Sequence, residues 1–396
     1  ATAVVADDLT RDLGLSGAQL GLLASMYFYA YALMQIPSGI LADYVGPRRS
    51  ATAGMLLAAV GALLFSMASQ AGWAYLGRLL VGVGVGAIFI CTLKMQAIWF
   101  RASEFATIAG LTSVLGNFGG ILATTPLAIL VDSLGWRPTF RYIALATLGV
   151  ALLVWLLVRD RPEELGFVAP NPTSAQPEVP LGQALLSVLR NRYTWPNVIY
   201  FFCISGSVTA FSGLWGIPYL TQAYGVDRQV ASQVVLMMTL GVALGGPAMG
   251  WLSDRIGRIK PILLGSSALY TLIWLYILHL VGGRPPFAWN YILYFVLGFI
   301  SIGFLLCFNN VKQVNNPAVS GMASGVVNTA GFGGTAILNS YVGQLLERVA
   351  PGPNYSLTAF RFAFSVFIAL SLLAFLAANL IKEQPQSQVA GGVNNE

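Results

Sequence analysis

Residues 39–49 read Gly-Ile-Leu-Ala-Asp-Tyr-Val-Gly-Pro-Arg-Arg, and a degraded copy at residues 250–260 reads Gly-Trp-Leu-Ser-Asp-Arg-Ile-Gly-Arg-Ile-Lys. Each copy ends a long apolar segment with a small-residue turn, an acidic residue and a basic cluster. A second pair of matching stretches is Gly-Asn-Phe-Gly-Gly at 116–120 and Ala-Gly-Phe-Gly-Gly at 330–334. Two repeats in the same order indicate an internal duplication, with equivalent charged hinges in the two halves.

The composition indicates a membrane protein. Only 9% of the 396 residues are charged, 56% are hydrophobic, and the mean hydropathy is +0.72. A soluble domain of this length needs far more charge to cover its surface. The net charge of +6 does not indicate a nucleic-acid partner, because the basic residues sit in short loops between apolar runs. We therefore expect an all-α, multi-pass integral membrane protein.

Gly, Pro and charged residues separate eleven apolar segments that are long enough to cross about 30 Å of hydrocarbon as helices. They are too long for strands and lack alternation. The expected spans are 17–41, 51–69, 72–99, 104–131, 136–158, 194–222, 228–253, 261–281, 287–314, 320–346 and 359–381.

The basic residues predict the orientation. If the loop after the first span is cytoplasmic, twelve of the 21 Lys and Arg lie toward the inside and eight toward the outside. This bias has the sign of the positive-inside rule. We therefore expect a protein of a bacterial inner (plasma) membrane with a cytoplasmic C-terminus.

Residues 159–193 separate five expected spans from six. This segment is rich in proline, which predicts a surface linker, and its amphipathic part at 181–192 predicts an interfacial helix. Because eleven is an uneven number for a duplicated bundle, we expect that a first helix is missing, with residues 1–5 as its tail; the alternative is a native eleven-span protein. The expected domains are an N-terminal lobe over 1–158, a cytoplasmic linker over 159–193 and a C-terminal lobe over 194–396.

Four stretches resemble motifs of the major facilitator superfamily. Residues 39–49 resemble its Gly-x-Leu-Ala-Asp-Arg-x-Gly-Arg-Arg loop, 77–84 its Arg-x-x-x-Gly-x-Gly pattern and 134–140 its Gly-Trp-Arg-x-x-Phe turn. Residues 27–37 resemble the branch that contains sugar-phosphate and organic-anion permeases. The resemblance implies two pseudo-symmetric six-helix lobes and secondary transport by alternating access. One departure is Tyr44, which stands where the motif usually has a basic residue.

The resemblance implies a gating role for the charges of the repeated motif. Asp43 would pair with a basic side chain in one conformation and release it in another, which biases a two-state equilibrium by about 1–3 kcal/mol. The alternative is a surface anchor that sets the topology. The expected gating residues are Asp43, Arg48, Arg49, Arg101, Glu104, Asp254 and Arg258.

The charges expected at membrane depth are basic. All fifteen acidic residues fall in loops, helix ends or termini, whereas Lys94 lies within a span, with Arg78 nearer the outer face and Lys312 nearer the inner. An ionisable group at depth costs roughly 2.5–3.5 kcal/mol, so it usually faces a wet cavity. The resemblance places Lys94 and Lys312 on cavity-lining helices. Positive charge without negative charge there favours an anionic cargo. The alternatives are lysines that snorkel and an arginine that packs helices.

Polar and aromatic side chains that recur on single helix faces complete the expected substrate site. Aromatic stripes at helical spacing also pack in cores, so packing is the alternative for each of them. The expected substrate-binding residues are Lys94, Arg78, Lys312, Tyr27, Tyr31, Gln35, Asn117, Trp215, Tyr219, Asn309, Asn310 and Asn328.

The sequence contains no motif that indicates an enzyme or a cofactor. Cys91, Cys203, Cys307 and His279 lie in apolar runs without metal-ligand spacing, and the Gly-x-Gly runs lie within spans. We expect a monomeric transporter of a small organic or phosphorylated anion, coupled to protons or to exchange of a second anion, with membrane lipid around it and no metal or cofactor. The alternatives are an exporter of hydrophobic compounds or siderophore-like chelates, and a ligand sensor without net transport.

Overall fold

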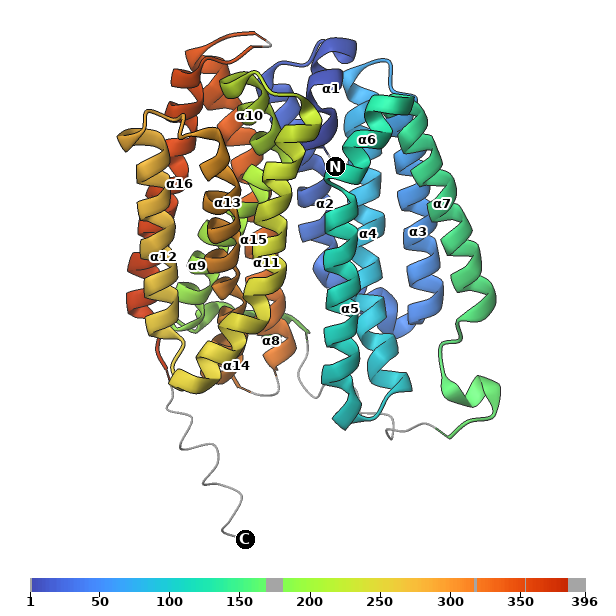
Figure 1. Ribbon diagram of the computed structural model, residues 1–396. Coiled ribbons are helices and arrows are strands. Elements are labelled where there is room, and N and C mark those ends of the chain that lie inside the picture. Colours follow the sequence, from blue (N-terminus) through green and yellow to red (C-terminus); the bar gives the residue numbers. More distant parts are fainter. Residues whose placement is uncertain (1, 169–180, 317–318, 353, 384–396) are drawn as a thin grey trace. The chain divides into compact units, whose positions relative to one another are not determined.

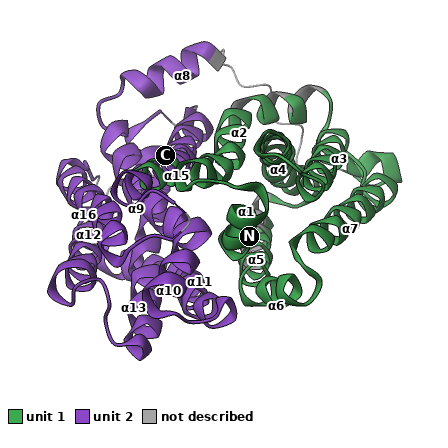
Figure 2. Cartoon of the chain, turned by 90° about the horizontal axis from the view of Figure 1, so that it is seen from above, with its two compact units in different colours: residues 1–176, 339–344 green, residues 177–338, 345–396 purple. Residues whose placement is uncertain are grey.

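The computed structural model describes residues 2–168, 181–316, 319–352 and 354–383, and every regular element in these ranges is helical (Figure 1). The chain divides into two compact units, which Figure 2 shows in different colours. Unit 1 comprises residues 1–176 and 339–344, and unit 2 comprises residues 177–338 and 345–396. The boundary at 176/177 lies inside the expected linker, and each unit is described by itself below.

Unit 1 is a helical bundle in which α4 packs against both α2 and α3, and α3 also packs against α7. Glycines bring these helices into backbone contact: a Cβ at Gly84 of α4 would lie 2.2 Å from the carbonyl oxygen of Gly54 on α3. Small residues allow membrane helices to approach this closely. The elements are η1 Ala3–Val5, α1 Ala6–Leu13, α2 Gly17–Tyr44, α3 Pro47–Ser66, α4 Ala71–Trp99, α5 Ala102–Leu122, α6 Thr125–Leu134, α7 Trp136–Leu157 and η2 Pro162–Leu165.

Unit 2 is built in the same way, with a close glycine contact between α11 and α13. A Cβ at Gly298 would lie 2.0 Å from the carbonyl oxygen of Met238, and one at Gly241 would lie 2.1 Å from that of Phe295. The elements are α8 Leu181–Arg190, α9 Thr194–Ala210, the π-helical turn η3 Phe211–Trp215, α10 Gly216–Tyr224, α11 Arg228–Ile256, α12 Lys260–Leu275, the π-helical turn η4 Tyr276–Leu280, α13 Phe287–Ser301, η5 Ile302–Leu305, α14 Leu306–Val314, α15 Ser320–Val349 and α16 Leu357–Leu380. Residues 339–344 of α15 group with unit 1.

Each of the eleven expected spans coincides with a helix or a run of consecutive helices, with one break. The expected span 104–131 is interrupted at Ala123 and Thr124, because Pro126 starts a new helix at its first turn, where its missing N–H costs nothing. Eight helices or helix runs in the described residues are long and apolar enough to cross a membrane: 47–66, 71–99, 136–157, 194–224, 228–256, 260–280, 287–314 and 357–380. The chain is therefore an integral, multi-pass membrane protein, while the count of eleven spans and the missing first helix stay predictions.

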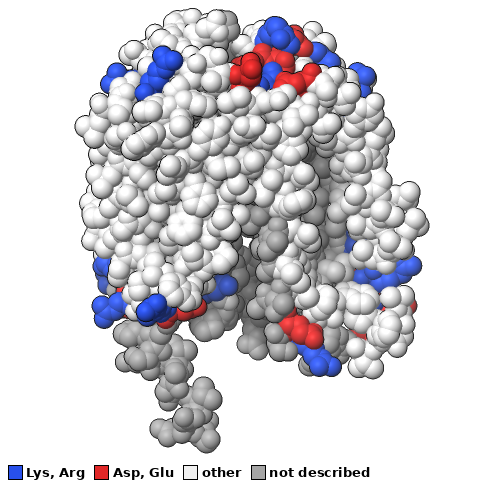
Figure 3. All heavy atoms as spheres, in the orientation of Figure 1, with Lys and Arg blue, Asp and Glu red and all other residues white. Residues whose placement is uncertain are grey.

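On one face of the protein, the charged side chains are distributed as a bilayer requires. On the face drawn in Figure 3, Lys, Arg, Asp and Glu lie at the ends of the helices, and the band between is uncharged. One end of unit 1 holds the connections after α2, α4 and α7, and one end of unit 2 holds those after α11, α14 and α16. We refer to these as the predicted inner ends, following the positive-inside prediction.

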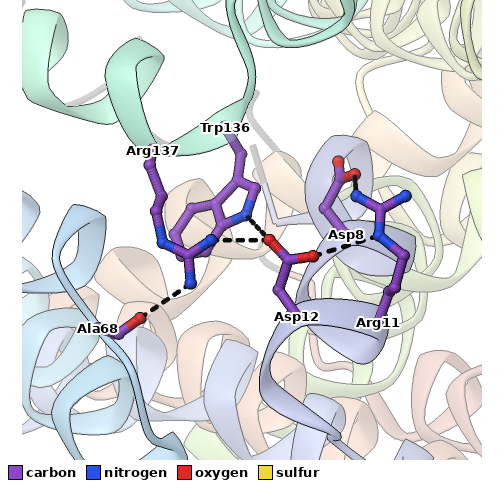
Figure 4. Close-up of polar contacts among 6 residues, drawn as sticks. All are labelled: Asp8, Arg11, Asp12, Ala68, Trp136 and Arg137. Carbon is purple, nitrogen blue, oxygen red and sulfur yellow. Dashed lines mark hydrogen bonds and ion pairs between the residues drawn. The ribbon is translucent and has the colours of Figure 1, made fainter.

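A charged cluster fastens the N-terminal segment at the predicted outer end of unit 1 (Figure 4). The Asp12 carboxylate accepts hydrogen bonds from Trp136 Nε1 at 3.0 Å and Arg137 Nη1 at 2.7 Å, and Arg11 bridges it to Asp8. The Trp136 bond, with help from the two arginines, holds the pKa of Asp12 below its usual value. A lowered carboxyl pKa stabilises the fold above the unfolded-state value, and this contribution is lost as the pH falls through the folded-state value. The Gly-Trp-Arg motif thus has a structural role here.

Candidate functional site

Arg78 is a charged group within the helix bundle of unit 1, on the part of α4 nearer its start at Ala71. Its Cζ atom lies 5.1 Å from the ring centroid of Tyr27 on α2 and 6.0 Å from that of Phe65 on α3. The Arg78 Nε atom is buried without a hydrogen-bond partner, the residue as a whole is partly buried, and no described carboxylate forms an ion pair with the guanidinium. Cation–π contacts contribute about 0.5–2 kcal/mol, whereas an unpaired buried charge costs several kcal/mol. Within the described residues, Arg78 is therefore a cation without a compensating carboxylate.

The spacing of the Arg-x-x-x-Gly motif explains how Arg78 reaches Tyr27. Gly82 lies one helical turn after Arg78 on the same face of α4. A Cβ at Gly82 would lie 2.3 Å from the carbonyl oxygen of Tyr27, so only glycine lets α4 touch the α2 backbone there. The glycine sets the helix separation, and the arginine one turn away then lies over the tyrosine ring.

The expected α2 stripe is partly assembled around this arginine. The Tyr27 and Tyr31 ring centroids are 6.0 Å apart, and Gln35 Nε2 donates a hydrogen bond to the Tyr31 carbonyl oxygen at 3.5 Å. Tyr31 and Gln35 are each 7% exposed. Tyr27 and Arg78 are in contact, whereas Gln35 bonds to its own helix.

Lys94 occupies a separate position on α4. It follows Arg78 by sixteen residues, which at 1.5 Å per residue is about 24 Å along the helix. Because α4 ends at Trp99, Lys94 lies toward the predicted inner end. Arg78 and Lys94 therefore cannot contact the same small anionic group at once.

Asn310, expected at the substrate site, is a structural residue in unit 2. It is 1% exposed; its Oδ1 accepts from Asn197 Nδ2 at 2.9 Å, and its Nδ2 donates to the Lys382 carbonyl oxygen at 2.9 Å. Its amide thus links α14, α9 and the segment after α16. Asn309 and Lys312 are exposed on the same short helix, and Asn328 is partly buried on α15.

Trp215 and Tyr219 lie in the aromatic core of unit 2, although they were expected at the substrate site. Both side chains are fully buried, and the Tyr219 hydroxyl donates to the Gly283 carbonyl oxygen. The Tyr219 ring also packs against Phe360 and Phe364, each with centroids 5.4 Å away. Neither residue presents surface to a solute in this structure, because packing accounts for the whole side chain. The side chains of Asp43 and Asn117 lie outside the described residues.

Within unit 1, the described gating residues lie in more than one place. Arg101 and Glu104 form a local cap, with the Arg101 N–H donating to Glu104 Oε2 at 2.9 Å, and both line an open pocket of about 380 Å³ with Trp99, Pro162, Phe167 and Val168. Arg49, Asp254 and Arg258 are exposed. Arg48 instead contacts the end of α7: its Cζ lies 4.4 Å from the Trp155 ring centroid, and its guanidinium donates to the Trp155 carbonyl oxygen.

Asp160 completes this contact and forms what we call the clasp of unit 1. Three residues beyond α7, its carboxylate accepts a hydrogen bond from the Arg48 N–H at 2.8 Å, in the first turn of α3. Gly46 has φ +98°, which other residues rarely adopt, and a Cβ there would lie 2.9 Å from Asp160 Oδ1. A side chain at this position would therefore strain the backbone and clash with the carboxylate. The Asp160 carboxylate stabilises the positive end of α3, and the Arg48 guanidinium binds the Trp155 carbonyl group near the end of α7.

Unit 2 contains the equivalent clasp. Glu383, three residues beyond α16, accepts hydrogen bonds from the N–H groups of Ile259 and Lys260 at the start of α12, the latter at 2.6 Å. The Lys260 ammonium donates to the Asn379 carbonyl oxygen at 2.6 Å. Ile259 and Arg48 occupy the same position in the two motif copies. Both copies thus join the first turn of one helix to the last turn of another.

We expect Asp160→Ala and Glu383→Ala each to destabilise the protein by about 1–2 kcal/mol, since each removes a charged cap from a helix start. Thermal unfolding in a neutral detergent measures this loss. Glu163→Ala is the matched control, because the Glu163 side chain is exposed and makes no hydrogen bond in the described residues, while the carbonyl oxygen that accepts from the Gly166 N–H is kept. Equal stability of the clasp variants and the control would contradict the capping role.

The two units contain similar helix bundles and equivalent clasps, and the comparison with known proteins identifies a family to which this architecture belongs. The sequence matches the Major Facilitator Superfamily profile over residues 1–339 and again over 217–393. The chain belongs to the major facilitator superfamily. A bacterial homolog of the human lysosomal transporter Spinster superposes with a TM-score of 0.75 at 16% identity, covering 97% of this chain and 94% of that structure, which supports the fold. The nucleoside transporter NupG gives a TM-score of 0.74 at 15% identity, with 97% and 95% covered.

Two bacterial relatives are named as transporters of anions, and a third is named a sensor. The probable sulfoacetate transporter SauU of Cupriavidus necator is 27% identical over 266 residues, 64% of this chain, and the match spans only 60% of that relative. The glycerol-3-phosphate transporter of Bacillus subtilis is 25% identical, covering 85% of this chain and 80% of the relative. The membrane sensor protein UhpC of Salmonella typhimurium is 26% identical, covering 93% and 85%. The expected family membership is confirmed.

Proposed function

We propose that this protein is a secondary active transporter that moves a small organic or phosphorylated anion by alternating access, coupled to protons or to anion exchange. The unpaired guanidinium of Arg78 is the observation that carries this proposal. An anion at Arg78 would supply the compensating charge that no described carboxylate supplies, and in a site of low dielectric this attraction is strong. The names of the relatives point to the same cargo class.

The proposed path has two cationic stations on α4. Arg78 with Tyr27 and Tyr31 forms the binding station, and Lys94 forms a second station toward the predicted inner end. A guanidinium can bind two oxygens of a phosphate, sulfonate or carboxylate, and an ammonium acts as a point charge during passage. Asn117, Asn309, Lys312 and Asn328 remain candidates for further contacts, and Asp43, Arg49, Arg101, Glu104, Asp254 and Arg258 for gating. We place the protein in a bacterial inner membrane with a cytoplasmic C-terminus.

Flux through proteoliposomes tests this function. We expect uptake of a phosphorylated or sulfonated three-carbon solute and no uptake of its uncharged parent alcohol. Because one relative is named a sensor, a ligand-sensing protein is the second candidate, and saturable binding of the anion without any flux would support it. Flux of hydrophobic compounds that anions do not inhibit would instead support the exporter alternative.

A further inference from the structure

A basic corner lies at the predicted inner end of unit 2, distinct from the proposed transport site. We use this name for Arg192, Tyr193 and Lys382. Arg192 Nη2 donates to the Tyr193 hydroxyl at 2.7 Å, and its Cζ lies 4.8 Å from the tyrosine ring centroid. The Lys382 ammonium lies 4.5 Å from the same centroid. One tyrosine ring thus holds two cations close together.

The like charges of the basic corner are not neutralised by described residues. Neither Arg192 nor Lys382 forms an ion pair with a carboxylate in the described ranges, and Glu383 directs its carboxylate oxygen to the start of α12. The pKa of Tyr193 is lowered, first by the hydrogen bond from Arg192 and then by the charges of Arg192 and Lys382. Two neighbouring cations repel each other unless an anion lies between or beside them.

An amide network fixes the backbone of this corner. The Tyr193 N–H donates to Asn191 Oδ1 at 3.0 Å, and Asn197 Nδ2 donates to the Tyr193 carbonyl oxygen at 3.2 Å. Asn310 Nδ2 donates to the Lys382 carbonyl oxygen. The two segments that carry the cations are therefore held in place before any ligand arrives, which lowers the entropy cost of binding.

The corner lies at the ends of two helix runs that are long and apolar enough to cross a membrane. Tyr193 directly precedes the membrane-crossing run 194–224, and Lys382 follows α16 by two residues. Exposed apolar side chains lie close by in the sequence: Leu186 is 47% exposed on α8, and Trp195 is 44% exposed while its indole N–H donates to the Leu189 carbonyl oxygen at 3.0 Å. Exposed tryptophan and leucine beside arginine and lysine are typical of a membrane interface.

We propose that Arg192, Tyr193 and Lys382 bind the phosphate headgroup of an anionic phospholipid. The guanidinium and the ammonium contact the phosphate oxygens, and the tyrosine hydroxyl, which accepts a hydrogen bond from Arg192, donates its own hydrogen to the lipid. The apolar surface of Leu186 and Trp195 contacts the glycerol and upper acyl region. The bound lipid supplies the negative charge that the corner lacks and ties α8, α9 and α16 to the bilayer surface.

The test is a titration of the full chain in neutral detergent with phosphatidylglycerol, read as the shift of the unfolding temperature. We expect saturable stabilisation by phosphatidylglycerol and none by phosphatidylcholine. Each basic residue near an anionic surface changes affinity about fivefold, so Arg192→Gln with Lys382→Gln should raise the half-saturating lipid concentration about 25-fold. Tyr193→Phe keeps the ring and loses one donor, and should raise it about threefold.

Arg284→Gln is the matched control. The Arg284 Cζ atom lies 5.4 Å from the ring centroid of Tyr224, which is at the other end of the helix run 194–224. The Arg284→Gln substitution therefore removes an equivalent arginine–tyrosine pair. We expect its phosphatidylglycerol titration to equal that of the unmodified chain. An unchanged titration in the double variant would overturn the proposal, as would an equal loss in the control. Equal stabilisation by inorganic phosphate at the same concentration would also overturn it, by showing a free-phosphate site instead of a lipid site.

Discussion

Arg78→Met is expected to reduce anion transport at least about 100-fold and, in the absence of ligand, to raise the unfolding temperature. Transport falls because two or more charge-assisted hydrogen bonds to the cargo are lost, at about 1.5–3 kcal/mol each. Stability rises because methionine fills similar volume without burying an unpaired charge; replacing buried charges by apolar side chains often stabilises a protein by about 1–4 kcal/mol. Flux in proteoliposomes and thermal unfolding in detergent measure the two effects.

This prediction is specific because transport is expected to fall while the unfolding temperature is expected to rise. A residue that only packs helices would lose stability and activity together when replaced. Arg141→Gln serves as the matched control, because Arg141 is exposed on α7 and its loss should change neither quantity. Full transport by the Arg78→Met variant, or a lower unfolding temperature than the unmodified protein, would contradict the role proposed for Arg78.

Gly82→Ala is expected to destabilise the protein by about 2–3 kcal/mol and to reduce transport at least tenfold. The added Cβ would lie 2.3 Å from the Tyr27 carbonyl oxygen and 2.8 Å from the Ala30 Cβ, so α2 must move by about 1 Å. This shift separates the Arg78 guanidinium from the Tyr27 ring. Thermal unfolding and flux, measured on the same preparation, test both parts.

Gly72→Ala is the control for that substitution because it lies on the same helix. A Cβ at Gly72 meets no atom within 4 Å, and glycine-to-alanine replacement at an unhindered helical position stabilises by about 0.4–1 kcal/mol. The two variants should therefore differ in the sign of their stability change. Equal effects would show that α2 and α4 are not held together by the backbone contact at Gly82.

Much of the fold could be predicted from sequence because membrane helices carry long, punctuated apolar runs. The start of α2 at Gly17 follows from the capping box of Ser16 and Gln19, and its end follows from Gly46, which has positive φ. The break between α5 and α6 was missed, although Pro126 is its visible signal. The π-helical turns at 211–215 and 276–280 have no such signal in the sequence.

The candidate site was only partly predictable. Arg78 could be selected because arginine is costly in an apolar run, but its position over Tyr27 depends on a backbone contact between α2 and α4. Trp215 and Tyr219 were selected by helical spacing, which does not distinguish a cavity wall from a core. Asp160 and Glu383 were overlooked as helix caps, although each lies three residues after the last helix before a linker or tail. The equivalent positions of Asp160 and Glu383 in the two halves of the sequence are the signal that could identify them as helix caps.

The most direct measurement is equilibrium binding of glycerol 3-phosphate and of glycerol to the purified protein, with and without Arg78→Met. These two solutes differ only in the phosphate group. If an anion compensates the guanidinium of Arg78, the unmodified protein binds glycerol 3-phosphate or another small phosphorylated or sulfonated acid of this kind. It binds the uncharged parent compound at least about 100-fold more weakly. This preference for the charged compound is lost when Arg78 is replaced. Equal affinity for charged and uncharged solutes, or a preference that survives Arg78→Met, would contradict the account.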